Sequence, residues 1–130
     1  MAVLVDSSVW VSASDSRNPE CLKLKRLIAA NERVCIVKAI QVEVCQGARS
    51  DGEFRQLWEN LLGFEILEAT DLLWGKSAWN YFKCRRKGLT VGTLDCLIAT
   101  VARENEISLW TLDKQLRKTR SVIGFDEYAG

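Results

Sequence analysis

The chain has 130 residues, a formal net charge of +1, 48% apolar and 27% charged residues. This composition is typical of one globular domain over residues 1–130, and the small net charge excludes nucleic-acid binding through bulk positive charge. No apolar run is long enough to span a membrane, and the N-terminus lacks the basic region of a signal peptide. We therefore expect a cytoplasmic protein without membrane association.

The first half of the chain predicts strands and helices in alternation. Residues 2–5 form a short apolar strand pattern, and residues 34–37 are a second one, rich in β-branched side chains. The Asn-Pro-Glu segment at 18–20 is typical of a helix start. A further helix is expected over 38–48, and the Ser-Asp-Gly-Glu segment at 50–53 fits a capping box that opens another.

In the second half, a strand is expected over 64–67 and is followed by two helices over 70–88 and 93–105. A further strand over 107–111, a short helix over 113–118 and an edge strand over 122–125 complete the pattern. The order of the elements predicts an α/β fold with a mainly parallel sheet covered on both faces, a three-layer α/β/α sandwich. Ligands of such sheets bind beyond the carboxyl ends of the strands.

The histidine and cysteine content narrows the possible chemistry. The chain has no histidine, which excludes a Ser-His-Asp triad and a Cys-His pair. Its five cysteines have no CxxC spacing and are expected to be free core residues: Cys21, Cys35, Cys45, Cys84 and Cys96. A metal site here would depend on oxygen ligands, which favours hard cations such as Mg²⁺ or Mn²⁺.

Four acids are the candidate site residues. Asp6 follows the first strand and Asp113 the fourth, so we expect both at one rim of the sheet. Asp95 borders an apolar, small-residue face of a helix whose core side we expect to include Leu94, and Glu43 lies between two valines in a helix that we expect to be mostly buried. Ionised carboxylates in such places are costly unless they are paired or bind a metal. The ordinary alternatives are a helix cap for Asp6 and Asp113, a first-turn acid for Asp95 and a solvated residue for Glu43.

Four motifs resemble the PIN domain family, and more narrowly the VapC toxin nucleases of bacterial toxin–antitoxin pairs. They are VDSSVW at 5–10, VEVCQG at 42–47, GLTVGTLDCLIA at 88–99 and LWTLDK at 109–114. Each motif is short, but their order and spacing along almost the whole chain make the resemblance specific.

The resemblance implies a metal site and a reaction. Asp6, Glu43, Asp95 and Asp113 would gather at the C-terminal rim of the sheet and hold Mg²⁺ or Mn²⁺, with Ser7 and Thr111 as neighbouring hydroxyl groups. Many relatives carry a further Asp and a Phe after the last motif, where this chain has Gln and Leu, which weakens the case for a second metal. The implied activity is metal-dependent hydrolysis of RNA phosphodiester bonds.

The resemblance also implies partners. Relatives form homodimers and are silenced by a cognate VapB-like antitoxin that lies along a groove near the active site. We expect Trp58, Trp74 and Trp79 to line such a groove or a dimer face. From their charge, we expect the basic clusters at 83–87 and 114–120 either to hold RNA phosphates or to be solvated helix faces. The alternative is a catalytically inactive PIN scaffold that binds RNA or protein without cutting.

Overall fold

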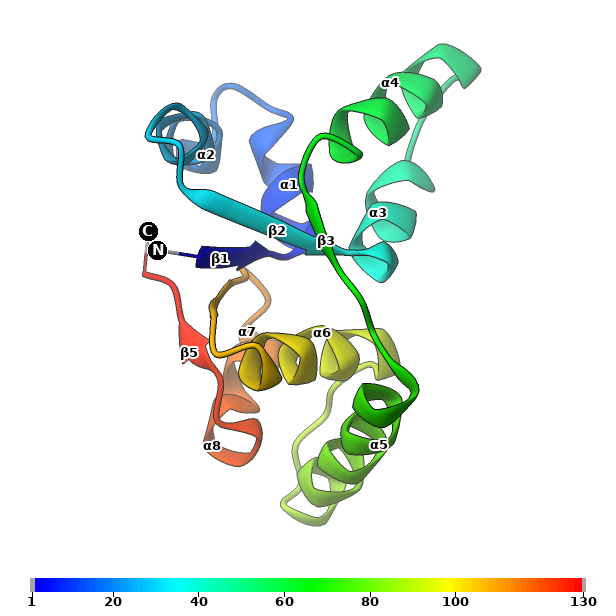
Figure 1. Cartoon of the computed structure of the whole chain (residues 1–130), viewed down its shortest axis with the longest axis vertical. Helices are drawn as coiled ribbons and strands as arrows, with labels where there is room; N and C mark the ends of the chain where they lie inside the picture. The colour runs from blue at the N-terminus through cyan, green and yellow to red at the C-terminus, as the bar shows by residue number, and fades with distance from the viewer. Residues whose placement is uncertain (1, 130) are drawn as a thin grey trace.

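Residues 2–129 are described by a computed structural model, which contains a five-stranded sheet (Figure 1). The strands are β1 (Ala2–Val5), β2 (Arg33–Val37), β3 (Glu65–Leu67), β4 (Ser108–Trp110) and β5 (Asp126–Glu127). Their order in the sheet is β3-β2-β1-β4-β5, and every pairing is parallel. The predicted parallel sheet is therefore confirmed.

Helices cover both faces of the sheet. They are α1 (Ser7–Ala13), α2 (Pro19–Ala29), α3 (Lys38–Cys45), α4 (Asp51–Leu61), α5 (Asp71–Arg86), α6 (Thr93–Glu104), α7 (Lys114–Lys118) and α8 (Arg120–Ile123). Figure 1 shows α1 to α4 on one side and α5 to α8 on the other. The three-layer α/β/α architecture is confirmed.

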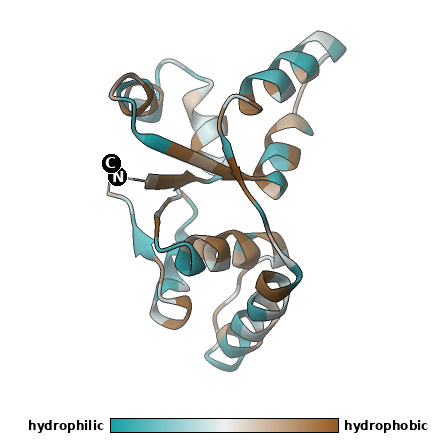
Figure 2. Ribbon diagram, viewed as in Figure 1, coloured by the Kyte–Doolittle hydropathy of each residue, from teal (hydrophilic) through white to brown (hydrophobic). Residues whose placement is uncertain are grey.

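The central strand β1 contributes side chains to the core on both faces of the sheet. Leu4 packs in a large cluster with residues of α6, whereas Val3 and Val5 pack in a second cluster with residues of α1 and α2. All three are fully buried. Burial on both faces explains the continuous apolar sequence of this strand, and Figure 2 shows the hydrophobic character of β1 and β2.

The predicted helix starts are confirmed in position, and side-chain caps form at Ser50 and Thr70 but not at Asn18, whose amide donates to the Ser12 carbonyl instead. Pro19 is in the first turn of α2, the hydroxyl of Ser50 accepts the Glu53 N–H at 3.1 Å, and that of Thr70 accepts the Leu73 N–H at 3.3 Å. Just beyond α5, Gly88 has a φ of 75°, a left-handed conformation that favours glycine.

The edge strand predicted over residues 122–125 is wrong. The N–H groups of Val122 and Ile123 donate to the Thr119 carbonyl at 2.9 and 2.8 Å, so this segment closes the short helix α8. Gly124 then ends the helix with a φ of 81°. The last strand, β5, begins at Asp126, four residues later than predicted.

The cysteines are free thiols, as the sequence predicted. Cys35, Cys45, Cys84 and Cys96 are buried, whereas Cys21 is partly exposed on α2, so its assignment to the core was wrong. Among the helices of residues 2–129, none combines the length and apolar character that crossing a membrane requires.

Leu4→Ala tests the central position of β1. Leu4 is fully buried, so the truncation leaves a cavity and should lower the free energy of unfolding by about 2–5 kcal/mol. Leu72→Ala is the matched control, because Leu72 on α5 is 67% exposed and should change stability by less than about 0.5 kcal/mol. Urea unfolding measures both, and equal losses in the two variants would contradict this core assignment.

Candidate metal centre

Three carboxylates from distant parts of the sequence meet at the carboxyl-end edge of the sheet. Asp6 directly follows β1, Glu43 lies on α3 and Asp95 lies in the first turn of α6. One carboxylate oxygen of each lies within 4.8 Å of those of the other two. No lysine or arginine of residues 2–129 forms an ion pair with any of the three.

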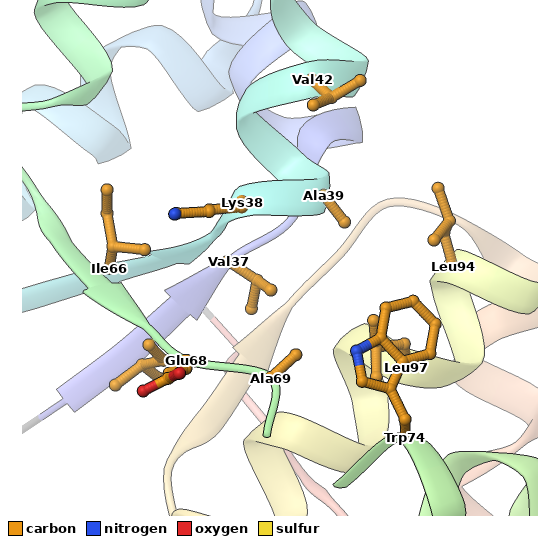
Figure 3. Close-up of a pocket in the computed structure, with 11 residues that line it drawn as sticks. Val37, Lys38, Ala39, Val42, Ile66, Glu68, Ala69, Trp74, Leu94 and Leu97 are labelled. Carbon is orange, nitrogen blue, oxygen red and sulfur yellow. The ribbon is translucent and has the colours of Figure 1, made fainter. Parts of the chain in front are cut away.

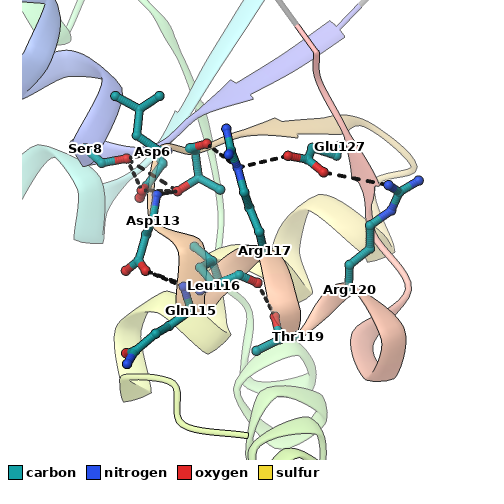
Figure 4. Close-up of polar contacts among 11 residues, drawn as sticks. Asp6, Ser8, Asp113, Gln115, Leu116, Arg117, Thr119, Arg120 and Glu127 are labelled. Atoms are coloured by element: carbon teal, nitrogen blue, oxygen red, sulfur yellow. Dashed lines mark hydrogen bonds and ion pairs between the residues drawn. The ribbon is translucent and has the colours of Figure 1, made fainter.

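Asp6 is fixed by its backbone and its side chain. Its N–H donates to the Trp110 carbonyl at 2.9 Å, which extends the pairing of β1 with β4. Its side chain is 2% exposed and makes no cap hydrogen bond to α1. Instead, Asp6 Oδ2 accepts the hydroxyls of Ser8 at 2.7 Å and Thr111 at 2.8 Å (Figure 4).

Two serines connect Asp6 to its surroundings. Ser7 Oγ donates to Glu43 Oε1 at 3.3 Å, which links the start of α1 to α3. Ser8 Oγ accepts the Leu112 N–H at 3.0 Å while it donates to Asp6. The sequence analysis had not assigned Ser8 to the site. A serine two residues after a strand-end Asp is the signal that could have identified it, because short hydroxyl side chains readily bond nearby groups.

Burial and neighbouring negative charges raise the pKa of two of these carboxylates, Asp95 and Glu43. The pKa of Asp95 is raised to about 6, first by burial and then by the negative charges of Asp6 and Asp113. The pKa of Glu43 is also raised, by burial and by the charges of Asp95 and Asp6, against the opposing hydrogen bond from Ser7. Like charges about 4 Å apart repel by roughly 4 kcal/mol at an effective dielectric near 20, and a cation removes this repulsion. Hard oxygen donors without a cationic partner fit Mg²⁺ or Mn²⁺.

Asp113 is outside the group of three carboxylates. Its Oδ1 accepts the N–H groups of Gln115 at 2.9 Å and Leu116 at 3.3 Å, so Asp113 is the N-cap of α7 (Figure 4). It is also close enough to raise the pKa of Asp95. The cap role and the electrostatic role therefore coexist in one side chain.

An apolar groove of about 640 Å³ lies between α3, the β3 end and α6 (Figure 3). Its residues Val42 and Leu94 directly precede Glu43 and Asp95 in the sequence. Val42 is 50% exposed, and Leu94 is exposed as well, so both had been assigned wrongly to buried helix faces. Of the three tryptophans expected in a groove, Trp74 lines this one and Trp58 and Trp79 do not. The lining residues are Val37, Lys38, Ala39, Val42, Ile66, Leu67, Glu68, Ala69, Trp74, Leu94 and Leu97.

Comparison with known proteins identifies the family. The family model described as "PIN domain" matches residues 3–122, and the chain belongs to the PIN domain family. No curated protein matches the chain.

Solved structures share the fold at low sequence identity. VapBC2 from Rickettsia felis, bound to a promoter DNA fragment, matches with a TM-score of 0.80 and 17% identity over 98% of both chains. FitAcB from Neisseria gonorrhoeae matches with a TM-score of 0.75 and 18% identity over 92% of this chain and 94% of that one. PAE2754 from Pyrobaculum aerophilum matches with a TM-score of 0.66 and 17% identity over 92% of this chain and 84% of that one.

Asp95→Asn should stabilise the metal-free protein at pH 7.5. Since the folded-state pKa of Asp95 is raised from 3.8 to about 6, the folded state binds this proton more tightly than the unfolded chain does. The contribution of Asp95 to the free energy of unfolding therefore falls as the pH rises from about 4 to about 6. Asparagine removes the charge, so thermal unfolding in EDTA should show a gain in Tm at pH 7.5 that disappears near pH 4.5.

Glu59→Gln, an exposed carboxylate on α4, is the control and should show no such pH-dependent gain. A wild-type Tm equal to that of Asp95→Asn at both pH values would contradict the electrostatic description of the cluster.

Proposed function

We propose that this PIN domain is a metal-dependent endoribonuclease, the VapC-like toxin of a cytoplasmic toxin–antitoxin pair. The observation that supports the proposal most strongly is the cluster of Asp6, Glu43 and Asp95, which has no cationic side-chain partner within residues 2–129. A cluster of this kind opposes folding and has a clear use as a cation site.

Asp6, Glu43 and Asp95 would hold one Mg²⁺ or Mn²⁺ ion, and Asp113 would support the site from the start of α7. When bound, such an ion acidifies a water molecule and stabilises negative charge on a phosphoryl oxygen. This donor set is the reason to expect phosphodiester hydrolysis rather than nucleophilic side-chain catalysis, since the chain has no histidine.

The protein groups around the site have separate tasks in this proposal. Ser8 and Thr111 donate to Asp6 Oδ2, whereas Asp6 Oδ1 has only the long contact of 3.5 Å from Ser7 Oγ, so Oδ1 is the oxygen more available to a cation. Ser7 also donates to Glu43 Oε1, which would orient the Glu43 carboxylate toward the cation. Asp95, the carboxylate with the pKa of about 6, would lose its residual proton as the cation binds.

The apolar groove supports a protein partner. It lies against α3 and α6, the helices that carry Glu43 and Asp95, so a segment seated there would also lie beside the carboxylates. The Rickettsia felis structure is of VapBC2 bound to a DNA fragment from their promoter. We propose that a cognate VapB-like antitoxin occupies this groove and that the toxin itself is a homodimer.

Charge-removing substitutions test the nuclease. Asp6→Asn and Asp95→Asn should each lower Mg²⁺-dependent cleavage of single-stranded RNA by roughly 100-fold or more, because each removes a charge that the cation requires. Asp113→Asn should have a smaller effect, since asparagine keeps the N-cap of α7 and only the charge is lost. Glu59→Gln should cleave at the wild-type rate.

Cleavage by Asp6→Asn or Asp95→Asn at the wild-type rate would refute the assignment of the metal site. A wild-type protein that binds neither Mg²⁺ nor Mn²⁺ and cuts no RNA would favour the non-cutting scaffold.

Trp74→Ala tests the partner groove. A buried tryptophan at a protein interface typically contributes about 2 kcal/mol or more, so the variant should bind the antitoxin roughly 30-fold more weakly. Trp58→Ala, which removes an exposed tryptophan outside the groove, should bind normally. Calorimetry with the product of the adjacent reading frame measures both, and unchanged affinity of Trp74→Ala would remove the groove from the interface.

A further inference from the structure

The C-terminal half of α5 carries an exposed strip of aromatic and cationic side chains. This α5 strip consists of Trp79, Phe82, Lys83 and Arg86, which follow one another at helical spacing. Trp79 is 60% exposed and Phe82 is 47% exposed. Their rings stack with centroids 5.5 Å apart and an interplanar angle of 29°. Two large apolar rings are thus held side by side and open to solvent.

Each ring of the strip has a cation beside it. Lys83 Nζ lies 6.0 Å from the centroid of Trp79, and Arg86 Cζ lies 5.6 Å from that of Phe82. Arg85 and Lys87 adjoin them and are also exposed. No carboxylate of residues 2–129 forms an ion pair with any of these four cations. The positive charge of the strip is therefore available to a ligand.

The other basic cluster of the chain differs in this respect. Arg117 Nε lies 2.9 Å from Glu127 Oε1, and Arg120 Nη1 lies 3.7 Å from Glu127 Oε2 (Figure 4). Part of that cluster is neutralised within the protein, so the α5 strip is the stronger candidate for an anionic ligand.

Residues of the strip line two hollows of about 460 Å³ each. Phe82 and Arg86 line both hollows. One hollow is also lined by Trp79 and by Ser121 and Val122 of the α8 region, and the other by Tyr81. A flat group entering either hollow meets an aromatic ring and a cation together.

A second aromatic pair shows what is particular about the strip. Phe54 and Trp58 on α4 are also exposed and stacked, with centroids 6.1 Å apart and an interplanar angle of 11°. The charges on α4 are those of Asp51, Glu53, Arg55 and Glu59, so acids outnumber the one cation there. Of these two exposed pairs, only the pair on α5 has a cation placed over each ring among the described residues.

We propose that the α5 strip is a binding site for single-stranded RNA, separate from the carboxylate cluster. Bases would stack on Trp79 and Phe82, and phosphates would pair with Lys83, Arg86 and their basic neighbours. Single-stranded RNA supplies both kinds of group at once. A two-fold contact between two copies of the strip would instead bring its cations together, and an acidic peptide would leave the flat ring faces without a matching partner.

The strip shares no residue with the carboxylate cluster and lies well along α5 from the edge of the sheet. Helix α5 begins at Asp71, just beyond the carboxyl end of β3, and the strip lies 8 to 15 residues further along, which corresponds to about 12–22 Å of helix. A role for the strip in positioning long substrates rests on the proposed nuclease function, whereas its binding of RNA does not.

The test uses a fluorescein-labelled 12-nucleotide oligouridylate and the metal-free protein in EDTA, so that binding is measured without cleavage. Trp79→Ala should weaken binding by roughly 5- to 100-fold, as expected for the loss of one base-stacking contact. The matched control Trp58→Ala should bind like the wild type. Arg86→Gln should reduce the slope of log K against log salt concentration by about 0.7, the value for one phosphate contact with a single strand.

Arg86→Gln also serves as the second test if Trp79→Ala fails to fold. Unchanged RNA affinity in Trp79→Ala, or an unchanged salt slope in Arg86→Gln, would overturn the proposal. Equal losses in Trp79→Ala and Trp58→Ala would also overturn it. So would a change in self-association of Trp79→Ala without a change in RNA affinity.

Kinetics separate this proposal from the nuclease proposal. If the protein cleaves RNA, Trp79→Ala should raise KM for long RNA and leave kcat and the cleavage of a very short oligonucleotide unchanged. If no Mg²⁺-dependent cleavage occurs, the nuclease proposal fails, and binding of the oligouridylate in EDTA still decides the role of the strip.

Discussion

The pairing of β1 with strands on both sides determines where the site can form. β1 is hydrogen bonded to β2 and to β4 in parallel register, with Leu4 opposite Cys35 on one side and Leu109 on the other. The N–H of Asp6 continues this ladder to Trp110. A carboxylate at this point cannot move away from the sheet without breaking backbone hydrogen bonds. The other two acids are brought to it by α3, which directly follows β2, and by α6, which packs against β4.

This arrangement keeps three mutually repelling carboxylates close together in the folded state. Burial and neighbouring charges both raise the pKa of Asp95, so in the absence of a cation the apolar core has to offset the repulsion. The core can do so, since most of β1 and β2 and the middle of α6, from Cys96 to Ala102, are buried. The hydroxyls of Ser7, Ser8 and Thr111 supply hydrogen bonds where a lysine or arginine would otherwise supply charge. Under the proposed cation-binding function, this arrangement lowers local stability in exchange for activity.

The sequence allowed the sheet and the position of Asp6 to be predicted, because an apolar run that ends in an acid marks the carboxyl end of a buried strand. It also indicated that Asp95 borders a buried helix face. It could not give the distance between Glu43 and Asp95, which depends on how α3 and α6 pack in space. The exposures of Val42 and Leu94 were misjudged for the same reason, since an apolar residue on a helix can face the core or a groove. The chain end at 122–125 was misread because β-branched residues there are overridden by hydrogen bonds to Thr119 and by the left-handed Gly124.

The hydrogen bond from the Asp6 N–H to the Trp110 carbonyl has a consequence for the dynamics of the molecule. One residue belongs both to the backbone ladder of the central strands and to the carboxylate cluster. Any ligand that favours the folded position of the Asp6 side chain must also suppress the opening of β1 from β4, since the two events share the same peptide unit. Occupancy of the cluster and amide exchange in the middle of the sheet are therefore thermodynamically linked. Hydrogen exchange of the amides in β1 and β4 should slow when a ligand occupies the carboxylate cluster.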